Sequence, residues 1–174
     1  AWLPIESQPL TRDIAKLLNR PGTTGFRVAS VYPESTAAKA GLVIGDIITA
    51  VDDQQLTASA PEHYEELATL IRQYRIGDSA SLTVLRGDET LTIPVELVRS
   101  PKPNREMKEY RDENLELTVR NVSYFDKEKE QWRQQDVQGV LVNEVKMGGW
   151  AALGQISPGD LILAIDGTPT PDVD

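Results

Sequence analysis

The sequence predicts an α+β protein made of two small, mostly antiparallel β-barrel or sandwich domains with short helices. Three observations support this prediction: an internal repeat, runs of alternating polar and apolar residues, and turn signals between those runs. The segment that begins at Gly25 recurs at Gly139, and ten of 29 aligned positions are identical without a gap. Typical residue frequencies would give about two identities by chance, so the chain contains two copies of one domain.

Composition excludes several classes of function. The chain has 174 residues, with 18 basic and 27 acidic side chains and a net charge of −9. Because such a surface repels phosphate backbones, nucleic acid is not an expected partner. The apolar runs are far shorter than the roughly 18 residues of a membrane-spanning helix, so no membrane insertion is expected. The absence of cysteine excludes disulfides, cysteine-ligated zinc and thiol catalysis. No cofactor and no metal site are predicted.

The helices of the first copy, residues 1–98, are predicted from the signals at their ends. Thr11 and Ser35 are suitable N-cap residues for two short helices, and glycine or proline follows each helix as a stop signal. A third helix is indicated by apolar residues at helical spacing. The predicted helices span residues 10–19, 35–41 and 61–74.

The strands of the first copy are predicted from β-branched and alternating apolar residues between turn signals. Asp52-Asp53 follows one apolar run, and Asp166-Gly167 follows the corresponding run of the second copy; both are tight-turn signals that tolerate a positive φ. The polar stretch 86–89 turns one alternating run back onto the next and so indicates a hairpin. The predicted strands span residues 26–31, 47–51, 81–86 and 90–97.

The two copies differ in length. Residues 99–112 are predicted to be an extended linker, because they contain two prolines, several charges and no hydrophobic periodicity. The second copy, residues 113–174, has only eight residues after Asp166 and so lacks counterparts of the last helix and the hairpin. Either the sequence is truncated, which we favour, or another chain supplies the missing elements.

The order of these signals resembles a known family. Between Val31 and Ile48, a strand, a Ser-capped helix and a Gly45-Asp46 turn follow one another as in the bacterial-type, circularly permuted PDZ domains of HtrA/Deg serine proteases. The opening at 3–11 and the close at 75–88 fit the same pattern. Together with the repeat, the chain resembles the tandem PDZ domains in the C-terminal regulatory half of such a protease, with the second PDZ domain truncated.

The resemblance implies a peptide-binding groove in the first copy. In this family an extended peptide, usually a C-terminus, adds as a strand beside an exposed sheet edge and is covered by a helix. The loop that would hold the terminal carboxylate matches the start of the chain, and the last predicted helix would form the groove wall. A hydrophobic terminal side chain would be the natural guest. The peptide-binding residues expected on this basis are Trp2, Leu3, Pro4, Ile5, Glu6, Ser7, Tyr64, Leu67, Ala68 and Ile71.

This loop departs from the family pattern in both copies. The family has glycine in its middle, which lets backbone N–H groups converge on the carboxylate. Pro4 takes this place in the first copy, and Glu116 takes it in the second, within the loop Leu115-Glu116-Leu117. Proline removes an N–H donor, and glutamate repels an incoming carboxylate. Internal strand or loop ligands are therefore expected at least as much as C-termini, and the second groove is expected to be inactive.

Three features are open to a catalytic or metal-binding interpretation, and a structural interpretation is favoured for each. His63 is the only histidine, and because no serine-protease motif accompanies it, an exposed position at a helix start is expected. Asp46 and Asp160 follow glycine in separate copies, which favours a turn role over a shared acid–base site. The acidic stretch 125–136 lacks the central glycine and final glutamate of a calcium loop, which favours a solvated helix. The chain itself is therefore not expected to be an enzyme.

The expected function is peptide and protein binding. By resemblance, the chain would be the substrate-recognition and regulatory part of an HtrA/Deg-like, trypsin-like serine protease in the bacterial periplasm or cell envelope. Its partners would be peptides or unfolded segments with hydrophobic ends, with homo-oligomers formed through the parent protein. Two alternatives stay open: an oligomerisation or secretion scaffold without a protease, and the PDZ part of a C-terminal-processing or membrane-embedded protease.

Overall fold

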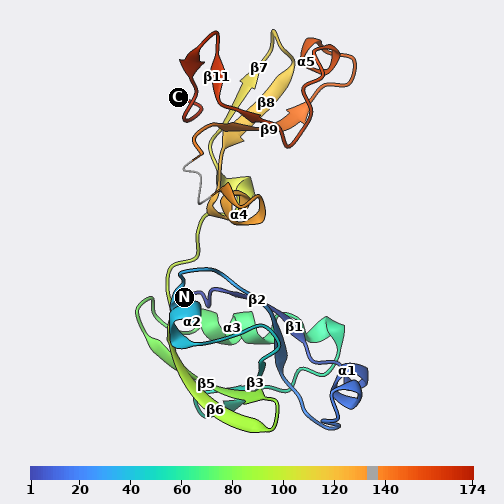
Figure 1. Cartoon of the computed structure of the whole chain (residues 1–174), viewed down its shortest axis with the longest axis vertical. Helices are drawn as coiled ribbons and strands as arrows, with labels where there is room; N and C mark the ends of the chain where they lie inside the picture. Colours follow the sequence, from blue (N-terminus) through green and yellow to red (C-terminus); the bar gives the residue numbers. More distant parts are fainter. Residues whose placement is uncertain (133–136) are drawn as a thin grey trace. The chain divides into compact units, whose positions relative to one another are not determined.

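The computed structural model describes residues 1–132 and 137–174, and the chain divides into two compact units, Ala1–Ser100 and Pro101–Asp174 (Figure 1). Both units are built from antiparallel sheets with a few short helices, which confirms the predicted α+β class. None of the described helices is long and apolar enough to cross a membrane. Within the same residues, no group of three or more acidic or histidine side chains is arranged to hold a metal ion.

Unit 1 contains a six-stranded antiparallel sheet in the order β1-β2-β3-β5-β6, with β4 paired to β3. A bridge between Trp2 and Val98 brings the two ends of this sheet together, as in a small barrel. Phe26, Ile48 and Leu82 are fully buried in its core. The strands are β1 (Ile5–Pro9), β2 (Phe26–Val31), β3 (Ile47–Val51), β4 (Gln54–Gln55), β5 (Ser79–Arg86) and β6 (Glu89–Glu96).

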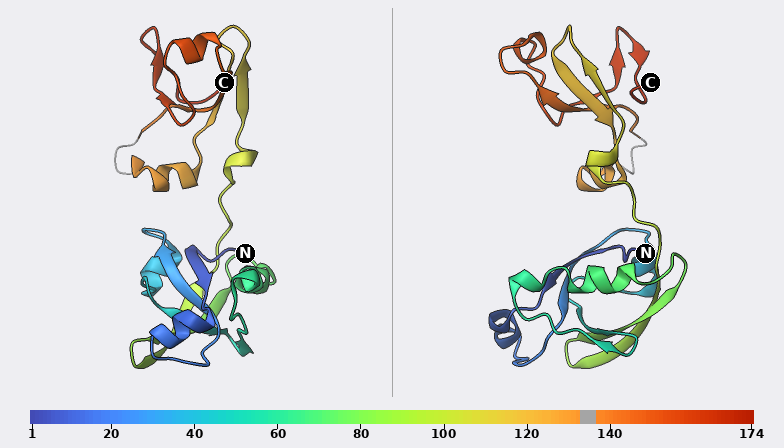
Figure 2. Two further views of the ribbon diagram at one scale, coloured as in Figure 1. Left: turned by 90° about the vertical axis from the view of Figure 1, so that its right-hand side faces the viewer. Right: turned by 180° about the vertical axis from the view of Figure 1, so that it is seen from behind.

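The first two helices of unit 1 begin at the predicted N-cap residues, Thr11 and Ser35. The Thr11 hydroxyl accepts the Ile14 N–H at 3.3 Å, and the Ser35 hydroxyl accepts the Ala38 N–H at 3.2 Å. The single helix predicted over 61–74 is instead a 3-10 turn followed by an α-helix, and this helix lies at the surface of unit 1 in both views of Figure 2. The helices are α1 (Arg12–Leu17), α2 (Thr36–Ala40), the 3-10 helix η1 (Pro61–His63) and α3 (Glu66–Arg72).

The Gly-Asp turn has a structural role. Asp46 is only 1% exposed, and its two carboxylate oxygens accept hydrogen bonds from Nε and Nη2 of Arg86, each at 2.8 Å. The same carboxylate accepts the Val43 N–H at 3.0 Å. In the second copy, Asp160 repeats the turn contact by accepting the Ser157 N–H at 2.9 Å. Both carboxylates are therefore occupied by turn contacts, in agreement with the predicted turn role.

Unit 2 contains a four-stranded sheet in the order β10-β9-β8-β7 and a separate pair, β11 and β12. Its core is smaller and includes Leu117, Val119, Val142 and Ala151. The strands are β7 (Glu109–Asp112), β8 (Leu117–Asn121), β9 (Val140–Val145), β10 (Leu161–Ile162), β11 (Ala164–Ile165) and β12 (Thr168–Pro169). The helices are the 3-10 helix η2 (Asn104–Glu106), α4 (Tyr124–Lys129) and α5 (Trp150–Leu153).

The strand register shows how the two copies correspond. Ile5 lies opposite Val31 in unit 1, and Leu117 lies opposite Val145 in unit 2; Val145 is the residue that the repeat aligns with Val31. The register of β1 on β2 shifts after Glu6, the second residue of β1. The register of β8 on β9 shifts after Thr118, the second residue of β8. Strand β8 therefore corresponds to β1, and Leu117 corresponds to Ile5.

The linker predicted over 99–112 is too long. Its last four residues form β7, which pairs with β8 along its whole length, and η2 lies within the same stretch. The prediction failed because the side chains of Glu109–Asp112 show no apolar alternation. Strand formation here comes from backbone pairing with β8, which the local sequence does not signal.

Candidate functional site

Residues of β1 and α3 line a groove in unit 1 with a volume of about 420 Å³. Figure 1 shows where β1 and α3 lie in the fold. Most of the residues that line the groove are apolar, and Arg72 is the only charged side chain among the described residues that line it. Such a lining suits an apolar guest with few polar contacts. The lining residues are Ala1, Trp2, Leu3, Ile5, Ser7, Tyr64, Leu67, Ala68, Ile71, Arg72 and Ser100.

Eight of the ten residues predicted for the binding site line this groove. The exceptions are Pro4, which is buried, and Glu6, which is exposed. The Glu6 carboxylate lies on the other face of β1, where it accepts a hydrogen bond from the Tyr32 hydroxyl at 3.2 Å. Because successive side chains of a strand point to opposite faces, Ile5 and Ser7 can line the groove only if Glu6 does not.

Sequence reasoning missed three lining residues, Ala1, Arg72 and Ser100. Arg72 lies four residues after Ala68 on α3, so helical spacing places both on one face and was the signal that could have found it. Ala1 and Ser100 lie at the two ends of unit 1, which come together through the Trp2–Val98 bridge. No local sequence signal indicates that contact.

Contacts at both ends fix α3 as the groove wall. At its start, the Glu66 carboxylate accepts the N–H groups of Thr57 and Ala58, each at 2.7 Å. Just after its end, the Tyr74 hydroxyl donates to Asp52 at 2.5 Å. Burial and this hydrogen bond raise the pKa of Tyr74 to about 12, while the same bond lowers the pKa of Asp52. The wall is therefore held against the segments after β3 and β4 without a ligand.

The backbone of β1 forms an open edge. Within the described chain, β1 pairs with β2 and with no other strand. Backbone hydrogen bonds at Pro4 and Leu10, just outside the two ends of β1, fix the alternation of the β1–β2 ladder. By this alternation Glu6 and Gln8 direct their N–H and C=O groups to β2. Ser7 directs both of its groups to the open edge.

The loop before β1 offers few N–H groups. Trp2 exchanges two backbone hydrogen bonds with Val98, at 2.8 and 3.1 Å. Pro4 has no N–H, and the Ile5 N–H is turned back onto the Leu3 carbonyl at 2.8 Å. Of the three successive positions 3–5, only Leu3 keeps an N–H that makes no hydrogen bond with another described residue.

In unit 2 the corresponding edge is covered by the chain itself. β7 runs antiparallel to β8, with Tyr110 opposite Val119 and Asp112 opposite Leu117. Just beyond β7, the Asn121 N–H donates to the carbonyl of residue 108 at 2.9 Å, which fixes the alternation. Val119, the counterpart of Ser7, therefore exchanges both backbone groups with Tyr110. The chain thus contains an example of an extended segment added to this edge.

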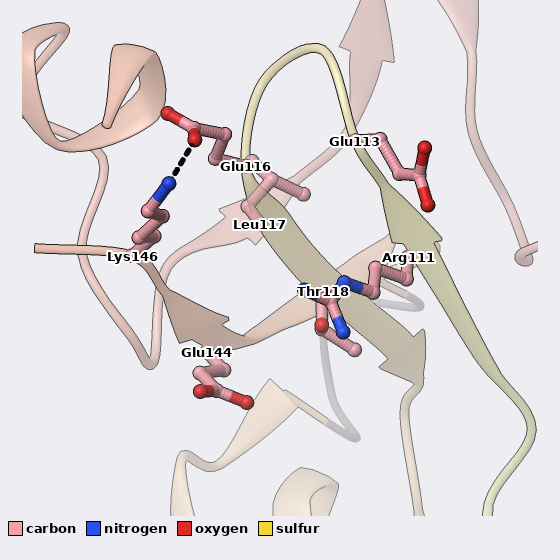
Figure 3. A pocket seen from close by; sticks show the side chains of 7 residues that line it. All are labelled: Arg111, Glu113, Glu116, Leu117, Thr118, Glu144 and Lys146. Carbon is pink, nitrogen blue, oxygen red and sulfur yellow. Dashed lines mark hydrogen bonds and ion pairs between the residues drawn. The ribbon is translucent and has the colours of Figure 1, made fainter.

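The second loop, Leu115-Glu116-Leu117, is also occupied. The Leu115 carbonyl accepts the Ala151 N–H at 3.1 Å, and Leu117 is buried in the core. Glu116 adopts a φ of 56° and forms an ion pair with Lys146, as Figure 3 shows. The hydrogen bond with Lys146 lowers the pKa of Glu116, so this carboxylate is already engaged by a partner within the chain.

A hollow of about 300 Å³ lies beside this second loop, and most of the residues that line it are charged (Figure 3). Both signs of charge are present, in contrast to the apolar lining in unit 1. The lining residues are Arg111, Glu113, Glu116, Leu117, Thr118, Glu144 and Lys146.

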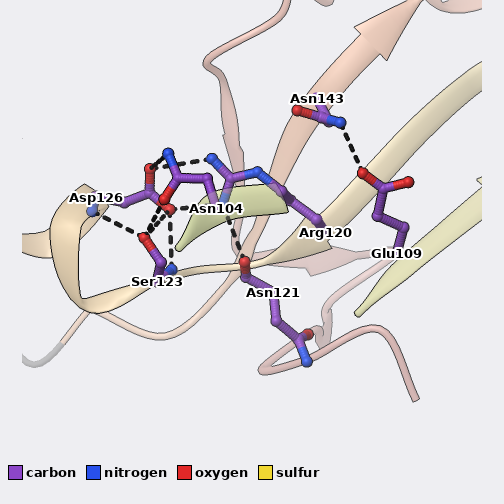
Figure 4. Close-up of polar contacts among 7 residues, drawn as sticks. All are labelled: Asn104, Glu109, Arg120, Asn121, Ser123, Asp126 and Asn143. Atoms are coloured by element: carbon purple, nitrogen blue, oxygen red, sulfur yellow. Dashed lines mark hydrogen bonds and ion pairs between the residues drawn. The ribbon is translucent and has the colours of Figure 1, made fainter. Parts of the chain in front are cut away.

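A buried ion pair ties α4 to β8. Arg120 on β8 and Asp126 in α4 are 5% and 8% exposed, and Nη1 of Arg120 lies 2.6 Å from Oδ2 of Asp126 (Figure 4). Ser123 forms a capping box with Asp126, and its hydroxyl also donates to the Asn104 side chain at 2.5 Å. A separate contact, from the Asn143 amide to Glu109 at 2.9 Å, joins β9 to β7.

The stretch 125–136 was expected to form a solvated helix, but Asp126 within it is buried. Burial opposes its ionisation, but hydrogen bonds from Arg120 and Ser123 outweigh burial, so the pKa of Asp126 lies below its ordinary value. This carboxylate is a buried structural anchor. Residues 133–136 of the same stretch lie outside the described residues.

An open sheet edge faced by a helix, in a small antiparallel domain that occurs twice, is the arrangement of domains that accept extended peptides. Comparison with protein families agrees with this class. A PDZ domain model matches residues 6–97, and a second PDZ domain model matches residues 121–174. The chain belongs to the PDZ domain family, and the predicted tandem PDZ organisation is confirmed.

Two curated relatives carry the name probable periplasmic serine endoprotease DegP-like. The protein of Pseudomonas savastanoi pv. phaseolicola is 29% identical over 167 residues, and that of Hahella chejuensis is 30% identical over 172 residues. Each alignment covers 95% of this chain and 34% of the relative, so the chain spans about a third of their length. The predicted resemblance to the PDZ half of HtrA/Deg-family proteases is therefore confirmed.

Among solved structures, the HtrA-type protease AlgW with a decapeptide is 31% identical in sequence to this chain. The match covers 59% of this chain and 30% of that chain, with a TM-score of 0.47.

The two edges should differ in amide hydrogen exchange. The Ser7 amide faces the open edge, whereas the Val119 amide is bonded to β7, so Ser7 should exchange at least about a hundredfold faster after correction for intrinsic rates. Exchange followed by ¹H–¹⁵N NMR on the whole chain measures both amides in one sample. Equal protection of Ser7 and Val119 would mean that the β1 edge is closed.

The buried pair of unit 2 should contribute to stability in a pH-dependent way. Asp126→Ala leaves Arg120 buried without its counter-charge and should lower the free energy of unfolding of unit 2 by about 3–5 kcal/mol at neutral pH. Urea unfolding monitored by tryptophan fluorescence measures this loss, with Glu130→Ala, an exposed acid just after α4, as the control.

Acidification should remove the difference between Asp126→Ala and the unmodified chain. The folded-state pKa of Asp126 lies below the ordinary value of 3.8. The stabilisation is therefore complete above that value and is lost as the pH falls through the folded-state pKa. An unchanged stability difference in strongly acidic solution would contradict the assignment.

Proposed function

We propose that unit 1 binds extended, hydrophobic peptide segments, which add as a strand to the open edge of β1 beneath α3. The observation that carries this proposal is the contrast between the two copies. Unit 2 places its own strand β7 antiparallel on the edge that corresponds to β1. The same edge in unit 1 has equivalent geometry and is not paired with any strand of the described chain.

Backbone hydrogen bonds and the burial of side chains should both contribute to the free energy of peptide binding. The N–H and C=O groups of Ser7 can each exchange one hydrogen bond with a peptide, and each bond contributes about 0.5–1.5 kcal/mol whatever the peptide sequence. Burial of one valine- or leucine-sized side chain against Leu67, Ala68 and Ile71 adds about 1.5–3 kcal/mol. Selectivity therefore comes from apolar side chains, which favours unfolded segments with hydrophobic residues or hydrophobic ends as partners.

We further propose that the chain is the substrate-recognition and regulatory part of an HtrA/Deg-like serine protease of the bacterial periplasm. The names of the relatives support this context, and the chain covers about a third of their length. The catalytic serine protease chemistry would belong to another part of such a protein. In this role, peptide binding at unit 1 would deliver a substrate or a regulatory signal to the protease.

Removal of the Ser7 N–H, which faces the open edge of β1, tests the proposed binding mode. Ser7→Pro deletes the N–H that faces the open edge but leaves the β1–β2 ladder intact, because proline is tolerated where its nitrogen faces away from the sheet. Binding of a fluorescein-labelled KVYFVGKG peptide with an amidated C-terminus should weaken about tenfold or more, as measured by fluorescence anisotropy. Ser7→Ala keeps the N–H and removes only the hydroxyl, so it should bind the peptide much more tightly than Ser7→Pro. Equal affinities of all three proteins would exclude strand addition at Ser7.

Filling the groove provides an independent test. Ala68 lines the groove on α3, whereas its neighbour Thr69 is exposed and does not. Ala68→Phe should therefore reduce affinity for the same peptide about tenfold or more, since the new ring occupies the space of the guest side chain. Thr69→Phe, the matched control, should leave affinity unchanged. A similar effect of both substitutions would place the binding site elsewhere.

A further inference from the structure

We infer that the groove of unit 1 accepts internal segments of its partner chains and does not depend on a free C-terminal carboxylate. This inference rests on the proposed function and specifies its ligand class. The observations that carry it are the hydrogen bonds of the loop before β1 and the course of the chain at the corresponding edge of unit 2.

The loop cannot surround a carboxylate with backbone donors. A terminal carboxylate loses its hydration on entering a groove, so it binds well only where several N–H groups converge on it. Pro4 has no N–H, and the Ile5 N–H already donates to the Leu3 carbonyl at 2.8 Å. The Leu3 N–H alone is left, and a single donor does not compensate for the lost hydration of an anion.

The corresponding edge of unit 2 holds an internal segment. β7 ends at Asp112 opposite Leu117, and the chain continues through two residues, 113 and 114, into the loop Leu115-Glu116-Leu117. No chain terminus lies at this edge. The edge therefore accommodates a strand whose chain runs on beyond the loop, and the equivalent geometry of β1 allows the same course for a separate peptide.

Among the side chains that line the groove, Arg72 is the remaining source of anion attraction. It is the only charged side chain among the described lining residues, and it is exposed on the last turn of α3. An exposed ion pair in water changes affinity by less than about fivefold. It also does not distinguish a terminal carboxylate from an acidic side chain. Arg72 can therefore give a mild preference for acidic ligands but no requirement for a C-terminus.

The experiment compares three fluorescein-labelled peptides on the whole chain by fluorescence anisotropy. They are KVYFV with a free C-terminal carboxylate, KVYFV with an amidated C-terminus, and the longer KVYFVGKG with an amidated C-terminus, in which the hydrophobic segment is internal. The three dissociation constants should agree within about fivefold. A preference of more than fivefold for the free acid over its amide would overturn the inference but leave the proposed function intact.

An N–H group restored at residue 4 should create a preference for the peptide with a free C-terminal carboxylate. Pro4→Gly returns an N–H to the loop and frees its backbone, so the variant should bind the free acid about tenfold or more tightly than the amide. Pro4→Ala also returns the N–H and serves as the second variant if glycine destabilises the fold. If both variants fold and neither gains the preference, the loop is not the cause and the inference is wrong. If none of the three peptides binds the unmodified chain, the proposed function fails and this inference with it.

Discussion

An edge strand leaves the N–H and C=O groups of alternate residues without partners, and the two units of this chain meet this constraint in opposite ways. In unit 2 the preceding segment folds back as β7 and satisfies the edge of β8. In unit 1 no second strand of the described chain pairs with β1, and α3 faces this edge across the groove. Because register and irregularity are the same in both copies, the two edges differ in whether a strand of the described chain pairs with them.

The open edge of unit 1 is short, and two prolines limit it. Pro9 is the last residue of β1 and Pro4 precedes its first, so neither offers an N–H to a visiting strand. Between them, Ile5 is bonded to its own loop, which leaves Ser7 as the donor. A long unpaired edge would invite association between copies of the sheet, whereas a single donor position beside an apolar groove favours a short, well-placed ligand.

The sequence predicted the parts of the fold that local signals control. Strands β2 and β3, the caps at Thr11 and Ser35 and the two-copy organisation all agree with the structure, because hydrophobic runs and end signals act within a few residues. β7 was missed because its pairing depends on backbone contact with β8 and its side chains show no alternation. Glu6 was predicted to belong to the binding site, but strand alternation directs its side chain to the other face of β1, where it bonds to Tyr32. The donor missing at Pro4 could be predicted, but the hydrogen bond that also removes the Ile5 N–H depends on the folded loop.

The central claim is that a peptide pairs with the backbone of β1, and intermolecular NOEs test it most directly. The ¹⁵N,¹³C-labelled chain is mixed with an unlabelled hydrophobic peptide, and contacts between peptide and protein backbone protons are recorded with isotope filtering. We expect an antiparallel ladder of contacts centred on Ser7, with peptide side-chain contacts to Ala68 and Ile71. Contacts confined to unit 2, or a bound peptide without backbone contacts to β1, would contradict this account.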